Sequence, residues 1–129
     1  MEITAHNHTQ WQAGFGYQQA VEVRDATSTL YVSGQAAMNE RGEPSTADMA
    51  TQLAEAIGNL EAILARAGYP LGGIVRLTVY TTDHDGLLPH FPTLTAWLAQ
   101  HGIRAAMTLL TVQRLYGTLS VQLEATAVR

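Results

Sequence analysis

Few side chains in this sequence have the types and spacings that a metal site needs. The chain has no cysteine, which excludes disulfides, thiolate catalysis, zinc ribbons and iron–sulfur clusters. His6 and His8 lie close together near the start, and His84 directly follows Asp83. No second cluster has metal-ligand spacing, so we expect exposed loop histidines rather than a metal site. We expect no cofactor either.

The glycine-rich motifs that mark common catalytic sites are also missing. Ser33 precedes Gly34 outside a Gly-x-Ser-x-Gly motif, which excludes the nucleophile elbow of a hydrolase. Leu71-Gly72-Gly73 is a turn before a strand-like run and lacks the pattern of a phosphate-binding loop. Local motifs therefore predict no particular reaction.

The charge pattern argues against nucleic acids and membranes as partners. The net charge is −4, and the seven basic residues are all arginines scattered along the chain. Such scattering offers no basic stripe to a phosphate backbone. The first residues, MEITAHNHTQW, lack the cationic and apolar regions of a signal peptide, and no apolar run approaches the ~20 residues of a membrane span. We expect a soluble cytoplasmic protein.

Length and composition predict one domain, residues 1–129, that also buries surface against copies of itself. Hydrophobic residues make up 47% of the chain and charged residues only 14%. This balance makes disorder improbable and extensive burial expected. An oligomer of identical chains would cover the apolar surface that one small domain leaves exposed.

The first two strand-like runs are expected to form a hairpin. Residues 17–24 and 29–33 are rich in β-branched, small apolar and aromatic residues, and the polar residues 25–28 separate them. A turn segment that contains glycine and proline follows at residues 39–44.

Residues 45–68 are expected to form a long amphipathic helix. Ser45 with Asp48 resembles a capping box, and Gly68 followed by Pro70 is a typical helix end. The apolar residues recur at helical spacing, which predicts one buried face. That face comprises Met49, Leu53, Ala56, Leu60, Ile63, Leu64 and Ala67.

The rest of the chain predicts three further strands and a second helix. The strands are expected at residues 74–81, 106–113 and 118–128, and the helix at residues 87–100, after a polar loop at 82–86. Pro92 fits the first turn of that helix. In the last strand apolar and polar residues alternate, which is typical of a strand with one buried face. We expect an α+β fold in which two helices cover one face of a mixed sheet.

Four ordered stretches together resemble one known family. They are Gly16-Tyr17-Gln18-Gln19-Ala20, the run Leu30 to Gln35 that ends in Ser-Gly-Gln, the segment Ala56 to Tyr80 with its Asn-Leu and Ala-Gly pairs, and Arg114-Leu115 with Glu124 to Val128. Each stretch is weak alone, but their order and spacing over nearly the whole chain are similar to the Rid family (reactive intermediate deaminase, also called YjgF or L-PSP).

The resemblance implies a chorismate-mutase-like α+β fold assembled as a homotrimer. In that assembly the sheets form a central β-barrel, and three clefts lie between neighbouring subunits. Active members hydrolyse small enamines or imines to 2-ketoacids and ammonia. An arginine holds the substrate carboxylate with two parallel hydrogen bonds, and a glutamate assists the attacking water.

Some positions of the family pocket match this sequence. Tyr17 matches the pocket tyrosine, and Ser33 with Gly34 matches the segment that lines the cleft. Arg114 matches an arginine of the family that does not bind the carboxylate. The resemblance therefore implies a small-molecule pocket that includes these residues.

Both charged groups of the family pocket are replaced. The carboxylate-binding arginine of the family precedes the arginine matched by Arg114 by seven residues, and Met107 stands there, between Ala106 and Thr108. The glutamate expected two residues before Glu124 is Gln122. The pocket that the resemblance implies is neutral at both positions.

Two interpretations of these replacements compete with simple packing of Met107. In one, Arg104 supplies the missing guanidinium from ~10 Å along the strand. In the other, the pocket takes a neutral or aromatic ligand. In that interpretation the expected substrate-binding residues, next to the matched Tyr17, are Phe15, Gly34, Met107, Thr108 and Leu109.

Two hypotheses of function follow. The first is a divergent Rid-family hydrolase of a small imine, enamine or related carbonyl compound, in which Ser33, Gly34 and Gln122 position water and Tyr17 donates a hydroxyl. Gln122 cannot act as a base, so this version relies on orientation. The second is a non-catalytic trimeric protein that binds a small molecule in the same cleft. Nuclease activity is disfavoured because the chain is acidic and has no basic cluster.

Overall fold

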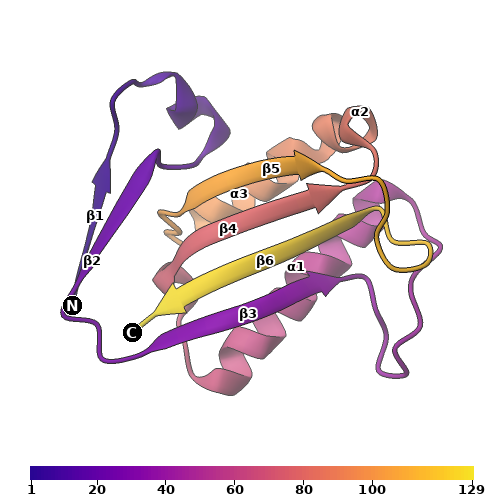
Figure 1. Ribbon diagram of the computed structural model, residues 1–129, viewed down its shortest axis with the longest axis horizontal. Helices are drawn as coiled ribbons and strands as arrows, with labels where there is room; N and C mark the ends of the chain where they lie inside the picture. Colours follow the sequence, from indigo (N-terminus) through magenta and orange to yellow (C-terminus); the bar gives the residue numbers. More distant parts are fainter.

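The computed structural model describes all residues from 1 to 129 as one sheet, a separate two-stranded ribbon and a layer of helices (Figure 1). The strands are β1 (Glu2–His6), β2 (Ala20–Arg24), β3 (Thr29–Ala36), β4 (Ile74–Thr81), β5 (Ala106–Thr111) and β6 (Val121–Val128). The α-helices are α1 (Met49–Ala67), α2 (His84–Leu87) and α3 (Phe91–Gln100). Short 3-10 turns form η1 (Trp11–Phe15), η2 (Leu71–Gly73) and η3 (Leu88–His90).

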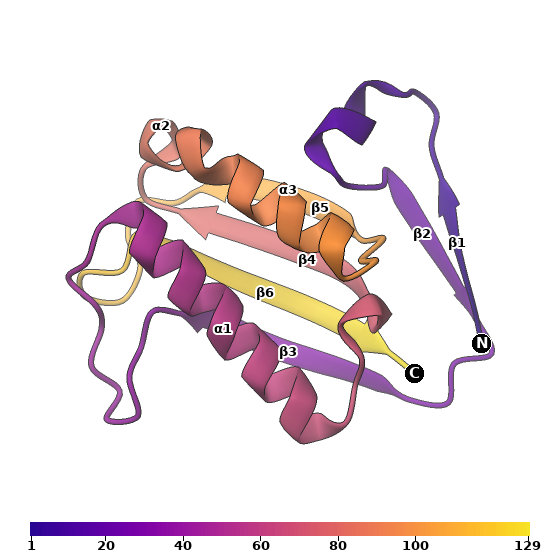
Figure 2. The same cartoon turned by 180° about the vertical axis from the view of Figure 1, so that it is seen from behind.

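The main sheet is mixed, with strand order β3-β6-β4-β5. β6 pairs antiparallel with both β3 and β4, whereas β4 and β5 are parallel. Helices α1 and α3 cover one face of this sheet, and the opposite face carries no helix (Figures 1 and 2). The expected α+β architecture is therefore confirmed. None of the helices combines the length and the apolar character that crossing a lipid bilayer requires.

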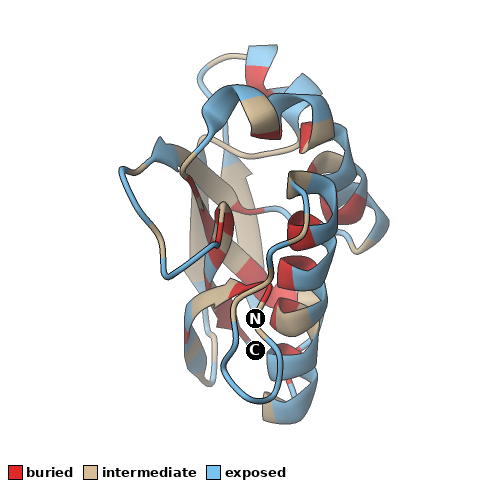
Figure 3. Ribbon diagram, turned by 90° about the vertical axis from the view of Figure 1, so that its right-hand side faces the viewer, coloured by how far each residue is buried: buried red, intermediate tan, exposed pale blue.

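The hydrophobic core lies between the helices and the sheet, where Figure 3 shows most of the buried residues. One cluster of 21 buried residues fills this layer. β6 contributes through alternation, as expected: Val121, Leu123, Ala125 and Ala127 are buried, while Gln122, Glu124 and Thr126 face the other way. Only the last residue, Val128, departs from this pattern, because it is buried too. This alternation leaves a row of polar side chains on the open face of the sheet.

Helix α1 begins with a different cap from the expected one. Asp48 is the N-cap residue, and its carboxylate accepts a hydrogen bond of 2.9 Å from the backbone N–H of Thr51. Ser45 lies outside the helix, where its hydroxyl accepts a hydrogen bond from the N–H of Ala47. Hydrogen bonding to Thr51 lowers the pKa of Asp48 below its ordinary value. Gly68 ends the helix with a φ of 78°, which glycine adopts without strain.

The buried face of α1 is rotated slightly from the expected one. Leu53, Ala56, Leu60 and Leu64 are buried as predicted, but Ile63 is 37% exposed. Gln52 is buried instead, because its amide replaces the hydrogen bonds that it loses to water. Its side-chain nitrogen donates to the carbonyls of Ala47 and Thr118, and its oxygen accepts from the N–H of Ser120. This residue ties the start of the helix to the segment that leads into β6.

The expected hairpin between residues 17–24 and 29–33 is wrong. β2 pairs antiparallel with β1, a strand that the sequence pattern did not predict, and β3 pairs with β6. The connecting residues hydrogen-bond to the chain end instead, since the N–H groups of Thr27 and Ser28 both donate to the carbonyl of Arg129. The alternation of side chains specifies which face of a strand is buried but not which strand pairs with it.

Three other boundaries differ from expectation. Residues 82–86 are not simply a loop, because α2 begins at His84 with Asp83 as its N-cap. The second long helix begins at Phe91 rather than at residue 87, and Pro92 does lie in its first turn. The last two strands are shorter at the ends that face each other, which leaves residues 112–120 as a connection.

The β1–β2 ribbon stands apart from the main sheet and joins it through residues just before β2 (Figures 1 and 2). The N–H of Gln18 donates to the carbonyl of Ala105, and Gln18 forms an isolated parallel bridge with Ala106. Gly16, with a φ of 79°, ends η1 and packs against Thr95 of α3. These contacts bring the aromatic residues of the N-terminal segment to the start of β5.

Candidate functional site

A cavity of about 510 Å³ lies where the N-terminal segment meets β5 and the helical segment from α2 to α3. It is bounded by η1, by α2 and η3, by the first turns of α3 and by β5. Seven of its eleven lining residues are hydrophobic. The lining residues are Trp11, Gly14, Phe15, Tyr17, His84, Leu88, Phe91, Pro92, Thr95, Met107 and Leu109.

Three aromatic side chains from the N-terminal segment form one wall. The rings of Trp11 and Phe15 lie 6.4 Å apart and those of Trp11 and Tyr17 lie 6.2 Å apart, both edge to face at 75°. This geometry is the favoured one for aromatic pairs. Trp11 is 62% exposed and Phe15 is 51% exposed. Exposed aromatic rings grouped around a cavity are typical of a surface that contacts a ligand or another protein.

Two side chains of β5 form another part of the lining. Met107 and Leu109 alternate along the strand, so both point to the side of the sheet where the helices pack. Thr108 lies between them and points to the open face, where its hydroxyl accepts a hydrogen bond of 2.9 Å from Arg76. The structure therefore places Met107 and Leu109 in the cavity and Thr108 outside it.

The cavity contains few polar side-chain groups. The Tyr17 hydroxyl, the Thr95 hydroxyl and the His84 imidazole are its polar groups, and no arginine or carboxylate lines it. His84 is the first residue of α2, because the carboxylate of Asp83 caps that helix by accepting from the N–H of Gly86. The Nδ1 atom of His84 lies 3.4 Å from a carboxylate oxygen of Asp85.

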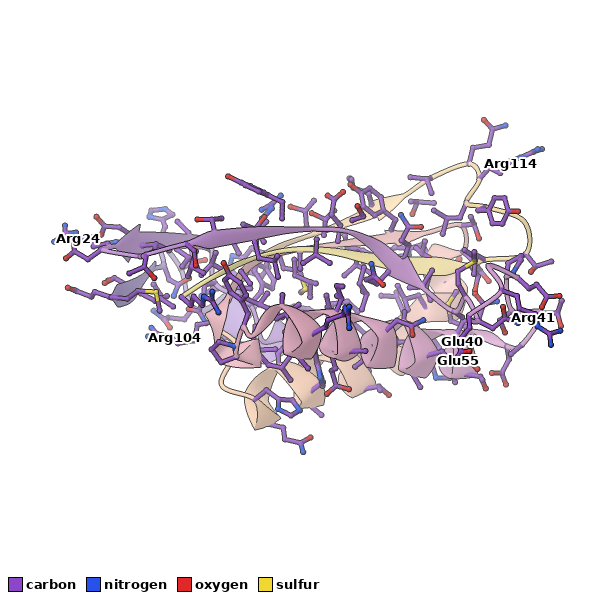
Figure 4. All side chains as sticks on the ribbon, turned by 90° about the horizontal axis from the view of Figure 1, so that it is seen from below. Arg24, Glu40, Arg41, Glu55, Arg104 and Arg114 are labelled. Atoms are coloured by element: carbon purple, nitrogen blue, oxygen red, sulfur yellow. The ribbon has the colours of Figure 1, made fainter.

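Arg104 does not reach this cavity within its own chain. It precedes β5, is exposed, and does not belong to the lining residues. Figure 4 shows Arg104 at the same end of the molecule as Arg24, whereas Arg114 lies at the opposite end with Arg41. No guanidinium therefore lies beside Met107 in the single chain.

The remaining expected site residues gather at a β-bulge on the other side of the sheet. The pairing of β3 with β6 shifts between Val32 and Gln35, so Ser33 and Gly34 bulge out of register. The side chain of Gln122 covers Gly34, and a Cβ on Gly34 would lie 2.8 Å from Cγ of Gln122 and closer to its amide. Only glycine leaves room for this amide.

The two groups of residues do not meet within one chain. Ser33 and Gly34 lie on β3 and Met107 lies on β5, which are the two outer strands of the sheet. Three strand spacings separate them, which is about 14 Å. Gln122 also faces the open side of the sheet, whereas Met107 faces the helices. We call the residues that line the cavity around Tyr17 and Met107 the cavity half. Ser33, Gly34 and Gln122 form the bulge half.

The open face of the sheet carries large and polar side chains beside the bulge half. Tyr31 is 82% exposed there, and Ser33 lines a hollow of about 320 Å³ together with Tyr31, Arg76 and Glu124. The Tyr80 hydroxyl donates a hydrogen bond of 3.1 Å to Glu124, which raises the pKa of Tyr80 above its ordinary value. A sheet face of this composition is suited to contact with another protein surface.

Sequence reasoning missed several residues of the cavity. Trp11 had a usable signal, because it precedes Phe15 at helical spacing and both stand next to Tyr17. His84 was expected in an exposed loop, but it lies on α2 and lines the cavity. Leu88, Phe91 and Thr95 join through the packing of the helical segment, for which the sequence holds no local signal. His, Asp and Glu side chains do not gather in groups of three anywhere in the structure.

Comparison with known proteins identifies the family of this chain. The chain is 30% identical over 106 residues to a 2-iminobutanoate/2-iminopropanoate deaminase of Escherichia coli, with 81% of this chain and 83% of that protein covered. The Rid-family protein YyfB of Yersinia pestis, whose function is unknown, matches over 100% of both chains with a TM-score of 0.88 and 28% identity. The YjgF gene product of E. coli matches with a TM-score of 0.70 and 31% identity, over 88% of this chain and 87% of that one. Since the family model described as endoribonuclease L-PSP matches residues 8–129, nearly the whole chain, this protein belongs to the Rid (YjgF/L-PSP) family.

Proposed function

We propose that this protein hydrolyses a small reactive imine, enamine or related carbonyl compound in a cleft that two copies of the chain build together. The observation that carries this proposal is the cavity around Tyr17 and Met107, since both residues occupy positions at which the family resemblance implies the pocket. The activity of the E. coli relatives, which are deaminases of 2-iminobutanoate and 2-iminopropanoate, supports the same reaction type.

An assembly is needed because Ser33 and Gly34 lie about 14 Å from Met107 across the sheet of one chain, and Gln122 faces the opposite side of that sheet. A homotrimer with a central β-barrel, as the resemblance implies, would bring the bulge half of one subunit to the cavity half of its neighbour. The open sheet face supports such an assembly, because Tyr31 is 82% exposed and no helix covers this face. Sedimentation tests this part directly: a stable monomer at assay concentrations would remove the cleft.

The reaction is the addition of water to a carbon–nitrogen double bond. Water adds to the carbon, a proton goes to the nitrogen, and the carbon–nitrogen bond then breaks to release ammonia and a carbonyl compound. We place Ser33, the backbone of Gly34 and Gln122 around the water, and the Tyr17 hydroxyl beside the reacting nitrogen or oxygen. Gln122 holds no proton to exchange, so its part is orientation of the water by hydrogen bonding.

Turnover assays test hydrolysis without assuming the substrate. An amino-acid oxidase generates 2-imino acids in situ, and an amine oxidase generates imines without a carboxylate. Carbonyl release is followed with and without the protein. Acceleration with either imine that falls at least about tenfold in Tyr17→Phe or Gln122→Ala supports the proposal. Arg104→Ala serves as a separate variant, since loss of 2-imino acid turnover there would assign the missing guanidinium to Arg104.

The second candidate function is a non-catalytic protein that binds a small molecule in the same cleft. The neutral residues Met107 and Gln122 favour it, because they stand where the resemblance implies an arginine and a glutamate. Saturable binding of a carbonyl compound without acceleration of either imine would identify this function. Activity gained by Met107→Arg combined with Gln122→Glu would show that only the charged groups were missing.

A further inference from the structure

We propose that the cleft takes an uncharged imine that carries an aromatic or branched apolar group, and that His84 exchanges protons with it. This inference rests on the hydrolysis proposed above and specifies its substrate class. It assigns a catalytic part to a histidine that stands outside the motif stretches carrying the family resemblance.

The charge of the cleft argues against a substrate that carries a carboxylate. None of the eleven residues that line the cavity is an arginine, lysine, aspartate or glutamate. The bulge half itself adds only a serine, a glycine and a glutamine, and the charged residues that line the hollow beside Ser33 are one of each sign, Arg76 and Glu124. A substrate carboxylate in such a site would lose its water without gaining an opposite charge, which is strongly unfavourable. An imine without a carboxylate meets no such penalty.

The shape and lining of the cavity favour a substrate with an apolar group. Its volume of about 510 Å³ is within the range of small-molecule sites. Trp11 and Phe15 present ring surface to solvent, since they are 62% and 51% exposed. A phenyl or branched aliphatic group would cover these rings and contact Met107 and Leu88. Burial of this apolar surface favours such a substrate over a small polar one.

The leaving nitrogen needs a proton, which one of the lining side chains must supply. Of the lining residues only Tyr17 and His84 carry a group that can give up and take back a proton, and imidazole is the side chain that most often serves as a general acid or base. The charged groups around His84 on its own helix are Asp85, 3.4 Å from Nδ1, and the capping carboxylate of Asp83, and Tyr17 lines the same cavity from the N-terminal segment. His84 is therefore the lining side chain best suited to this transfer.

A single imidazole can both supply the proton that the reaction needs and recover it. Water adds to the imine carbon and gives a carbinolamine. An imidazolium proton moves to the amino nitrogen, the carbon–nitrogen bond breaks, and ammonia leaves. The hydroxyl oxygen forms the carbonyl, and its proton returns to the imidazole. One imine and one water thus give one carbonyl compound and one ammonia.

Binding tests the substrate class independently of turnover. Phenylacetone and phenylpyruvate differ only in that a methyl group of the first is a carboxylate in the second. Trp11 lines the cavity, whereas Trp97 is 7% exposed in the core, so ligand-dependent fluorescence should come from Trp11 and vanish in Trp11→Phe. We expect phenylacetone to bind at least about tenfold more tightly, and Met107→Arg to reverse this preference. Equal or tighter binding of phenylpyruvate by the unmodified protein would overturn the substrate class.

Turnover tests the part assigned to His84. Phenethylamine with an amine oxidase gives an uncharged imine, and phenylalanine with an amino-acid oxidase gives its 2-imino acid counterpart. We expect acceleration of the first only, and His84→Gln should reduce it at least about 100-fold. His90→Gln is the matched control, because His90 occupies the N-cap position of α3 without a capping hydrogen bond and lies outside the cavity lining.

Each possible negative result overturns a different part of the proposals. Full activity of His84→Gln overturns the part of His84. Acceleration of the 2-imino acid alone overturns the substrate class while the proposed hydrolysis stands. If neither imine is accelerated, the proposed hydrolysis and the part of His84 both fail, and the comparison of phenylacetone with phenylpyruvate decides the ligand class.

Discussion

Replacing Gly34 with alanine is expected to destabilise the protein through one defined overlap. The new Cβ would lie 2.8 Å from Cγ of Gln122 and closer to its amide. Gly34 does not have a positive φ, so alanine meets no backbone strain at this position. The overlap can be relieved only if the side chain of Gln122 leaves its place in the bulge half.

The expected magnitude combines two opposing effects. Overpacking typically costs about 1–3 kcal/mol, while replacing glycine by alanine gains about 0.4–1 kcal/mol because the unfolded chain loses freedom. Gly34→Ala should therefore lower the free energy of unfolding by about 0.5–2 kcal/mol. In a Gln122→Ala background the overlap is absent. The same substitution should then raise the free energy of unfolding by about 0.5 kcal/mol.

Urea unfolding of the four proteins in this double-mutant cycle measures the effect. All four are compared at one protein concentration, because assembly would link stability to concentration. Gly58→Ala is the matched control: its Cβ would meet no atom within 4 Å, so it should stabilise α1 equally in both backgrounds. An equal cost of Gly34→Ala with and without the Gln122 side chain would refute the overlap as its cause.

Two further predictions concern the start of α1. Gln52→Ala leaves the N–H of Ser120 and two carbonyls without partners, so it should lower the free energy of unfolding by about 2–4 kcal/mol; a loss below about 1 kcal/mol in urea unfolding would contradict this. Because Thr51 lowers the pKa of Asp48, the stabilisation by this carboxylate is present above its ordinary pKa of 3.8 and is lost as the pH falls through the lowered value. Asp48→Asn should keep the cap at neutral pH and weaken the loss of stability in acid, and parallel acid profiles of the two proteins would argue against this.

The parts of the fold that sequence reasoning predicted are those governed by local periodicity. The strand at residues 74–81 was placed with its observed ends, and the alternation in β6 identified its buried side chains. Strand pairing was not predictable in this way. The apolar residues of β2 fit a hairpin with β3 as well as the observed pairing with β1, and the choice depends on contacts distant in sequence, such as those of Thr27 with Arg129.

The residues of the site divide in the same way, into those that could be predicted from the sequence and those that depend on tertiary packing. The resemblance located Tyr17 directly and Met107 by its spacing from Arg114. Phe15 and Leu109 were added because they suit a neutral or aromatic ligand, and all four residues line the cavity. Thr108 was grouped with Met107 by proximity in sequence, although adjacent residues of a strand face opposite sides. His84 lines the cavity together with residues of β5 and of the N-terminal segment, a placement for which its local sequence holds no information.

The two neutral positions also favour a functioning site over a decayed one. In the proposed cleft an arginine at position 107 and a glutamate at position 122 would belong to different subunits and face one substrate. Replacing only one of them would leave the other charge without its counterpart in a partly dry site, which is costly. Met107 and Gln122 are both neutral, so neither position leaves an unpaired charge in the cleft. Restoring either charge alone should therefore weaken binding of a neutral ligand, while Met107→Arg together with Gln122→Glu should favour a substrate that carries a carboxylate.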